Sequence, residues 1–165
     1  MGANRELLDD MEIVSTKDRP EYLPVLKCHL NSEWGEGDPF ATGPSGIRNP
    51  DSLVMTSKGE FVGGLSFTWI WLEQGSISEL WINTVYVVSE YRRQRVATQL
   101  IQAAVELAST IGQARLFVNS RNDTLYTKNG WKMYSSKGVD SVLVNNIEIS
   151  IHNNPVQPTV YTAAD

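Results

Sequence analysis

Cysteine and histidine are scarce in this sequence of 165 residues, which has one cysteine and two histidines. A disulfide within the chain is therefore excluded, and a reducing compartment, the cytoplasm, is expected. Cys28 stands in an apolar-periodic stretch, which favours a small buried residue over a nucleophile. His29 and His152 are far apart and are interpreted as structural. One cysteine and two distant histidines cannot form a zinc site, so we predict no metal centre.

Long apolar runs and a surplus of positive charge are also missing. No stretch of about 18 apolar residues occurs, so we expect no membrane span. The N-terminus lacks the apolar core of a signal peptide. Lysine and arginine total 14 against 19 aspartates and glutamates, giving a net charge of −5. This balance disfavours a nucleic acid partner.

Hydrophobic periodicity predicts one α+β (mixed α/β) domain, with a central, mostly antiparallel sheet and helices on both faces. We expect a leader at 1–10, the domain at 11–152 and a tail at 153–165. The predicted helices are one capped by Asp18 and ending near Trp34, one from the turn at 92–95 to about Ile111, and one at 123–128. The predicted strands are 11–14, 53–56, 61–71, 77–87, 114–118, 131–134 and 141–152. Gly63-Gly64 predicts a bulge.

Glycine and proline are concentrated in the segment 33–50, which therefore reads as a long loop. Loops of this length inside a compact domain are usually functional or disordered. Trp34, Trp69 and Trp71 could form a substrate wall, and core packing explains them equally well.

The most informative segment is 85–98. An apolar run rich in β-branched residues ends at Val88, a short turn carries Arg92, Arg93 and Arg95, and a helix follows at once. The first N–H groups of a helix have no intrahelical partner, and with the helix dipole they attract an anion. We interpret this turn as a phosphate cradle, most simply for the diphosphate of a coenzyme.

Two motifs resemble known sequences. Residues 87–97 resemble the acetyl-CoA motif of the GNAT superfamily of N-acetyltransferases, which reads Arg or Gln, two residues, Gly, one residue, and Gly or Ala. Here Arg92 takes the first place and Ala97 the last. Residues 125–132, Leu-Tyr-Thr-Lys-Asn-Gly-Trp-Lys, resemble the family's Leu-Tyr-Glu-Lys-x-Gly-Phe segment. The order of elements over 11–152 also matches, so the resemblance implies a GNAT-like fold.

The chain departs from the first motif at its glycine positions. Arg95 replaces the motif glycine, Arg93 stands where the family favours glycine, and Ser89 replaces a proline. Glycine lets a phosphate approach the backbone without a Cβ in the way. Two outcomes stay open: the Cβ of Arg95 displaces the diphosphate outward, or its guanidinium binds the diphosphate directly.

The resemblance implies acetyl-CoA as cosubstrate. The strand ending at Val87 would offer backbone groups to the pantetheine arm, and an N–H at 85–87 would face the thioester oxygen. Phosphates would lie on the N–H groups of 92–97. The implied cofactor-binding residues are Val85, Tyr86, Val87, Arg92, Arg93, Gln94, Arg95, Val96, Ala97, Thr98 and Asn119.

Three residues are candidates for catalysis. Tyr126 matches the family's usual general acid; the alternative is a half-buried aromatic that only packs. A strand alternates its faces, so we expect one face of the strand at 77–87 to carry Glu79, Trp81, Asn83, Val85 and Val87. Glu79 is the only carboxylate on that face and is a candidate base, while Asn83 could orient a water. Other acidic candidates are Glu33, Glu36 and Asp38, which could instead attract a cationic amine or merely solvate the loop.

The leading hypothesis is an acetyl-CoA-dependent N-acetyltransferase that acts on a primary amine, either of a small molecule or of a protein or peptide. The alternative is a GNAT-like module that binds acyl-CoA or a regulatory partner without catalysis. A nucleic acid patch at Arg92–Arg95 is a third and poorer interpretation, because one basic cluster without stacking aromatics is a weak footprint. A homodimer through the last strand or the tail is possible.

Overall fold

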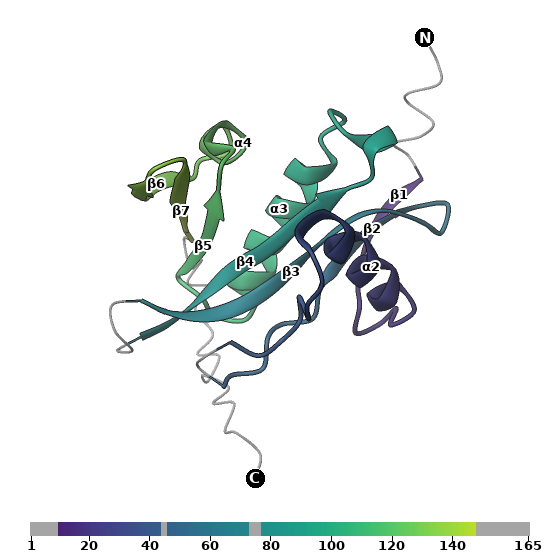
Figure 1. The fold of residues 1–165 in the computed structure, drawn as a ribbon, viewed down its shortest axis with the longest axis horizontal. Coiled ribbons are helices and arrows are strands. Elements are labelled where there is room, and N and C mark those ends of the chain that lie inside the picture. Colours follow the sequence, from purple (N-terminus) through teal and green to yellow (C-terminus); the bar gives the residue numbers. More distant parts are fainter. Residues whose placement is uncertain (1–9, 44–45, 73–76, 148–165) are drawn as a thin grey trace, which may run out of the picture.

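The computed structural model describes residues 10–43, 46–72 and 77–147, which form one seven-stranded sheet in the order β1-β2-β3-β4-β5-β7-β6 (Figure 1). The strands are β1 (Met11–Ser15), β2 (Leu53–Ser57), β3 (Glu60–Leu72), β4 (Ile77–Val87), β5 (Arg115–Ser120), β6 (Lys132–Lys137) and β7 (Asp140–Asn146). The helices are α2 (Tyr22–Trp34), the short 3-10 helix η1 (Ser89–Tyr91), α3 (Val96–Thr110) and α4 (Asp123–Thr127).

The predicted fold class and order of elements are confirmed. All neighbouring strands are antiparallel except β4 and β5, which are parallel and joined by α3 as a crossover helix. Asp18 does not cap α2, because it lies in a turn that closes on the carbonyl of Ser15, and the helix begins at Tyr22. Residues 1–9 of the predicted leader, residues 148–152 of the last predicted strand and the tail 153–165 lie outside the described residues.

The two long helices cover opposite faces of the sheet, and both faces have a buried core (Figure 1). On β2, Leu53 and Met55 point to the α3 side and Val54 to the α2 side. Gly64 is required by this packing, because a Cβ at that position would lie 2.8 Å from Cδ1 of Leu26 in α2. The predicted bulge falls one residue earlier, at Val62, where the β2–β3 register shifts.

Helix α2 buries Tyr22, Leu26 and Leu30, which are spaced four residues apart on one face. Cys28 lies off that face and is exposed, so the prediction of a buried cysteine was wrong. Its neighbour His29 stacks between the rings of Phe61 and Tyr86, at centroid distances of 4.8 and 4.9 Å, which agrees with a structural role.

A β-bulge at Asn83 changes the faces of β4. Thr84 pairs with Ser66 and Ile82 with Phe67, so Asn83 has no partner in the β3 register. A bulge of one residue exchanges the two faces of the strand beyond it. Leu80 and Ile82 before the bulge therefore share the α3 face with Val85 and Val87 after it. The predicted single face with Glu79, Trp81, Asn83, Val85 and Val87 was wrong for this reason.

Strands β4 and β5 pair over a very short distance. The parallel contact joins Trp81 to Phe117 and Ile82 to Val118, next to the bulge. Beyond this contact the two strands diverge, as Figure 1 shows toward the upper end of β5. We call this divergence of β4 and β5 beyond residues 82 and 118 the fork. The candidate site lies at this fork.

Two further expectations concern partners. Strand β7 is paired with β5 on one side and β6 on the other, so its described residues offer no free edge for a second copy. No helix in the described ranges is long and apolar enough to span a bilayer.

Candidate functional site

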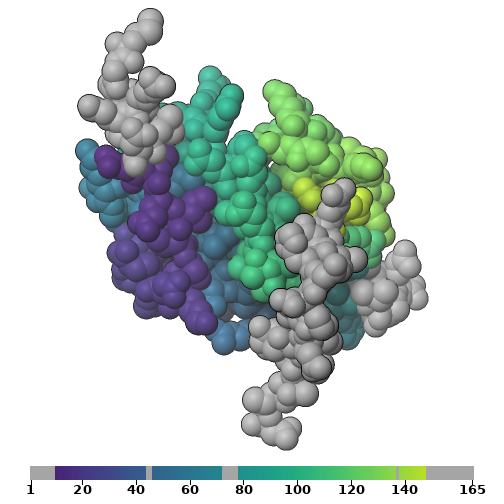
Figure 2. Space-filling model, turned by 180° about the vertical axis from the view of Figure 1, so that it is seen from behind, coloured from purple at the N-terminus to yellow at the C-terminus, as the bar shows by residue number. Residues whose placement is uncertain are grey.

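A cleft of about 1000 Å³ opens at the fork. Its wall includes Trp34 at the end of α2 and Val96 at the start of α3, helices that lie on opposite faces of the sheet. The cleft is therefore lined from both faces of the sheet at the fork. From the side of α3, Figure 2 shows a notch between the teal atoms near the start of α3 and the light-green atoms that follow β5.

The edge of β4 that borders the cleft carries unpaired main-chain groups. The N–H of Val88 donates to the carbonyl of Val62 in β3 at 2.9 Å. Because main-chain groups alternate between the two edges of a strand, the N–H groups of Val85 and Val87 point to the other edge, toward β5. Strand β5 pairs with β4 only before this point. These two donors are available to a ligand in the cleft.

Arg92 is bound to β4 through its Nε. Its Nε donates to the carbonyl of Val87 at 2.9 Å, and its guanidinium lies 5.7 Å from the centroid of the Tyr86 ring. The N–H of Arg92 donates to the carbonyl of Ser89. The sequence analysis counted this N–H among the predicted phosphate donors. In the structure it is already hydrogen-bonded within the turn. The arginine of the motif fastens the turn to the end of the strand.

Arg93 and Arg95 adopt left-handed backbone conformations, with φ of 62° and 64°. Both are exposed and line the cleft. The sequence explained the family's glycines by close approach of a phosphate, and positive φ supplies a second reason that only the backbone reveals. A left-handed conformation costs a residue with a Cβ about 1–2 kcal/mol. The turn keeps the glycine-like geometry and places a guanidinium at each of the two positions.

The beginning of α3 offers main-chain donors. Arg95 is the N-cap and makes no capping hydrogen bond with its side chain. The first intrahelical bond runs from the N–H of Gln99 to the carbonyl of Arg95, at 3.0 Å. The N–H groups of Val96, Ala97 and Thr98 therefore precede the first helical bond and face the cleft end of the helix, where the dipole is positive.

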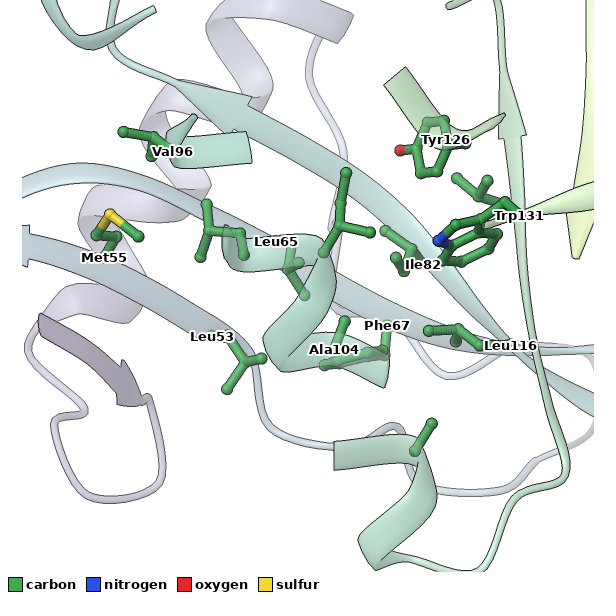
Figure 3. Packing of buried hydrophobic residues seen from close by; sticks show 14 of the residues in the cluster. Leu53, Met55, Leu65, Phe67, Ile82, Val96, Ala104, Leu116, Tyr126 and Trp131 are labelled. Atoms are coloured by element: carbon green, nitrogen blue, oxygen red, sulfur yellow. The ribbon is translucent and has the colours of Figure 1, made fainter. Parts of the chain in front are cut away.

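Tyr126 lies in the cleft wall at the end of α4 and is only 4% exposed. Burial raises the pKa of its phenol to about 12. Its ring packs edge-on against Trp131 with 5.1 Å between centroids, and Figure 3 shows the hydroxyl on the side of the ring away from Trp131. Within the described residues this hydroxyl has no hydrogen-bond partner. The phenol therefore stays protonated at neutral pH.

Only some of the candidate bases line the cleft. Glu79 is 8% exposed, pairs with Arg115 of β5, and is not part of the cleft wall. Asn83 does line the cleft, and its Nδ2 donates to the carbonyl of Pro39 at 3.1 Å, which ties the long loop to the bulge. Glu33 lines the cleft, whereas Glu36 and Asp38 do not.

The remaining predicted cofactor residues can also be divided into those that line the cleft and those that do not. Tyr86, Val96, Ala97, Thr98 and Asn119 line the cleft, and Gln94 does not. Sequence reasoning missed Arg121 and Asp140, whose side chains form an ion pair of 2.9 Å on the wall. A signal was available for Arg121, because it directly follows β5, and ligands commonly bind at the carboxyl ends of parallel strands such as β4 and β5. Asp140 follows a turn and carried no such signal.

The family model described as "Acetyltransferase (GNAT) family" matches residues 15–131. The chain belongs to the GNAT acetyltransferase family. The family and fold predicted from the two motifs are thereby confirmed. No curated protein sequence is significantly similar to this chain.

Solved structures of this GNAT fold are similar across most of the chain. An N-acetyltransferase from Staphylococcus aureus Mu50 has a TM-score of 0.63 at 14% identity, covering 84% of this chain and 99% of that one. Arabidopsis thaliana Naa50, solved with the bisubstrate analogue CoA-Ac-MVNAL, has a TM-score of 0.57 at 13% identity, covering 83% and 99%. The GNAT family N-acetyltransferase YhbS from Escherichia coli, solved with CoA, has a TM-score of 0.57 at 16% identity, covering 84% and 81%.

The backbone strain at Arg95 predicts the effect of restoring glycine. Arg95→Gly should raise the free energy of unfolding by about 0.5–1 kcal/mol, because relief of the left-handed strain exceeds the entropy cost of glycine. Gln102→Gly, at an exposed position inside α3, is the control and should lower it by about 1 kcal/mol. Urea unfolding measures both. A loss of stability in Arg95→Gly would contradict the assigned conformation.

The raised pKa of Tyr126 predicts a loss of stability in alkali. In the folded protein the pKa of this phenol lies above its usual value, because burial favours the neutral form. The folding stability is therefore fully present below pH 10 and falls as the pH rises toward 12. Wild type should lose roughly 2–3 kcal/mol more than Tyr126→Phe over this interval. Tyr134→Phe removes a half-exposed phenol outside the cleft and is the control. Identical pH profiles for wild type and Tyr126→Phe would exclude the burial effect.

Proposed function

We propose that this protein is an acetyl-CoA-dependent N-acetyltransferase that transfers the acetyl group to a primary amine. The observation that carries the proposal is the fork, because it opens one cleft to both faces of the sheet. Two substrates can then meet at the edge of β4 from opposite sides. The CoA and bisubstrate ligands of the similar structures support acetyl-CoA as one of them.

The residues of the cleft fit the parts of acetyl-CoA. The outward N–H groups of Val85 and Val87 suit the amide-rich pantetheine arm, which would bind to β4 much as an added strand does. The N–H groups of Val96–Thr98 suit the diphosphate, as helix N-termini generally do. The guanidiniums of Arg93 and Arg95 add two charge-assisted donors, which favours direct binding over outward displacement.

Acetyl-CoA supplies the acetyl group as an activated thioester. A β4 N–H at Val85 or Val87 would donate to the thioester oxygen and stabilise the charge that develops there. The amine nitrogen forms the new bond to the carbonyl carbon as the carbon–sulfur bond breaks. Tyr126 holds its proton at neutral pH and would donate it, or a hydrogen bond, to the departing sulfur.

Deprotonation of the amine is assigned to water in the cleft. Glu79 is engaged by Arg115 and stands outside the cleft wall, so it is poorly placed to take this proton. Asn83 is at the bulge, and its Nδ2 is occupied by Pro39. Its Oδ1 would accept a hydrogen bond from the amine or from the water that receives the proton. Turnover should therefore rise with pH as the free amine becomes neutral.

The alternative is a GNAT-like module that binds acyl-CoA without catalysis. The position of Glu79 outside the cleft wall, where it pairs with Arg115, favours this alternative, because the cleft lacks the predicted base. Release of free thiol from acetyl-CoA across an amine panel separates the two functions. Binding without any amine-dependent release supports the module.

The turn at 92–95, which we call the arginine turn, predicts an ordered series of acetyl-CoA affinities. Arg95→Glu should weaken binding on the order of 100-fold, because it replaces a charge-assisted donor by a repelling carboxylate. Arg95→Gly should stay within about tenfold of wild type, because closer approach of the helix N–H groups offsets the lost guanidinium. Lys128→Glu, an equal charge change on an exposed residue outside the cleft, is the control. Titration calorimetry measures all four proteins, and equal weakening by Arg95→Glu and Lys128→Glu would refute a direct role for the turn.

Loss of the Tyr126 hydroxyl should separate turnover from cofactor binding. Tyr126→Phe keeps the ring that packs on Trp131 but removes the donor, so kcat should fall on the order of 10²-fold with little change in the Kd for acetyl-CoA. Tyr134→Phe should leave both values near wild type. An undiminished kcat in Tyr126→Phe would remove this phenol from the mechanism.

A further inference from the structure

Charges are distributed unevenly over the cleft wall. Arg92, Arg93 and Arg95 gather at the start of α3, on one face of the sheet. The carboxylates on the described wall are Glu33, in the last turn of α2, and Asp140. Asp140 is neutralised by Arg121, whereas Glu33 has no ion pair within the described residues. The α2 side of the cleft therefore presents one uncompensated negative charge.

Trp34 stands beside this carboxylate and also lines the cleft. Trp34 is 58% exposed, the largest exposed fraction among the described tryptophans. The face of an indole attracts a cation, and a helix C-terminus adds negative potential. Helix α2 ends at Trp34, where the N–H of Gly35 returns to the carbonyl of Asn31. Carboxylate, indole face and helix terminus thus all favour a positive group.

Helix α2 leads into a loop that is hydrogen-bonded to the sheet. The loop that follows it is held at Pro39 by the side chain of Asn83, and at Arg48 by the indole N–H of Trp69, at 3.0 Å. The two bonds fix the loop to β4 and β3. Glu33 and Trp34 precede this bound loop and line the cleft from the α2 face, whereas α3 begins on the opposite face.

We propose that Glu33 and Trp34 bind a second positive charge carried by the amine acceptor, apart from the nitrogen that is acetylated. This inference rests on the proposed function. A carboxylate at the reacting nitrogen would stabilise its ammonium form and raise its pKa, which opposes attack on the thioester. The same carboxylate a few bonds away positions the acceptor without that penalty. The substrate class is a diamine or a peptide whose N-terminal residue is followed by a cationic side chain.

The test compares matched acceptors at saturating acetyl-CoA. For wild type, kcat/KM for 1,5-diaminopentane should exceed that for pentylamine, and Glu33→Gln should lower this ratio about fivefold through KM. Trp34→Ala should lower the ratio by a similar factor, and Trp34→Phe should retain most of it. Glu36→Gln is the matched control, because Glu36 is exposed and outside the cleft wall.

A second pair of acceptors identifies the source of the charge. Ala-Lys-amide and Ala-norleucine-amide differ only in the second cation. Preference for the diamine alone assigns a small-molecule acceptor, and preference for the lysine peptide alone assigns a peptide. In either case Glu33→Gln must remove the preference.

The proposal and the underlying function fail in different ways. Equal kcat/KM within both pairs, diamine against pentylamine and Ala-Lys-amide against Ala-norleucine-amide, or preferences unchanged in Glu33→Gln, would overturn binding of a second charge by Glu33 and Trp34 while leaving N-acetylation intact. If no amine is acetylated, quenching of tryptophan fluorescence by 1,5-diaminopentane in the CoA complex decides the matter. Weaker diamine binding by Glu33→Gln than by Glu36→Gln would support the site, and equal binding would overturn it.

Discussion

The cleft depends on an interruption of hydrogen bonding in the middle of the sheet. Strands β4 and β5 share one short parallel contact at Trp81 and Ile82 and then diverge. The main-chain groups of β4 beyond this contact would be expensive to bury without partners, so the edge must face water or a ligand. The bulge at Asn83 stands at this point and turns Val85 and Val87 onto the α3 face. A continuous β4–β5 ladder would satisfy these groups and close the cleft.

The arginine turn follows from the same constraint. Once β4 ends at the cleft, the chain must turn at once into α3, and two residues of that turn take positive φ. Most sequences would use glycine there, since it takes this conformation without strain. This chain keeps arginine at both positions and fastens the turn with Arg92 on the carbonyl of Val87. Strain retained beside an anion-attracting helix terminus is typical of a functional turn.

Much of this arrangement could be predicted from the sequence because its signals are local. The apolar run at 77–87, the breaker at Gly112 and the motif from Arg92 to Ala97 each specify an element or a turn within a few residues. What could not be predicted arises from register. The bulge at Asn83 is set by pairing with β3, a distant segment, and it reassigned every later residue of β4 to the other face.

The difference between local signals and distant pairing also explains which individual side chains were predicted correctly. Cys28 was expected to be buried from an apolar pattern, but the face of α2 that packs on the sheet is set by Tyr22, Leu26 and Leu30. Glu79 was the natural base on an unbroken strand, yet its partner Arg115 comes from β5, which no local pattern reveals. Tyr126 was identified by resemblance, and burial raises the pKa of its phenol, which gives a physical reason for it to stay protonated.

The most direct test of the open β4 edge is amide proton exchange by NMR, with and without CoA. In the free protein the amides of Val85 and Val87 should exchange much faster than that of Tyr86, which faces β3. On addition of CoA these two amides should become protected, and the signals of Val96–Thr98 should shift. Slow exchange at Val85 and Val87 in the free protein, or no change at these amides when CoA is added, would contradict the central claim.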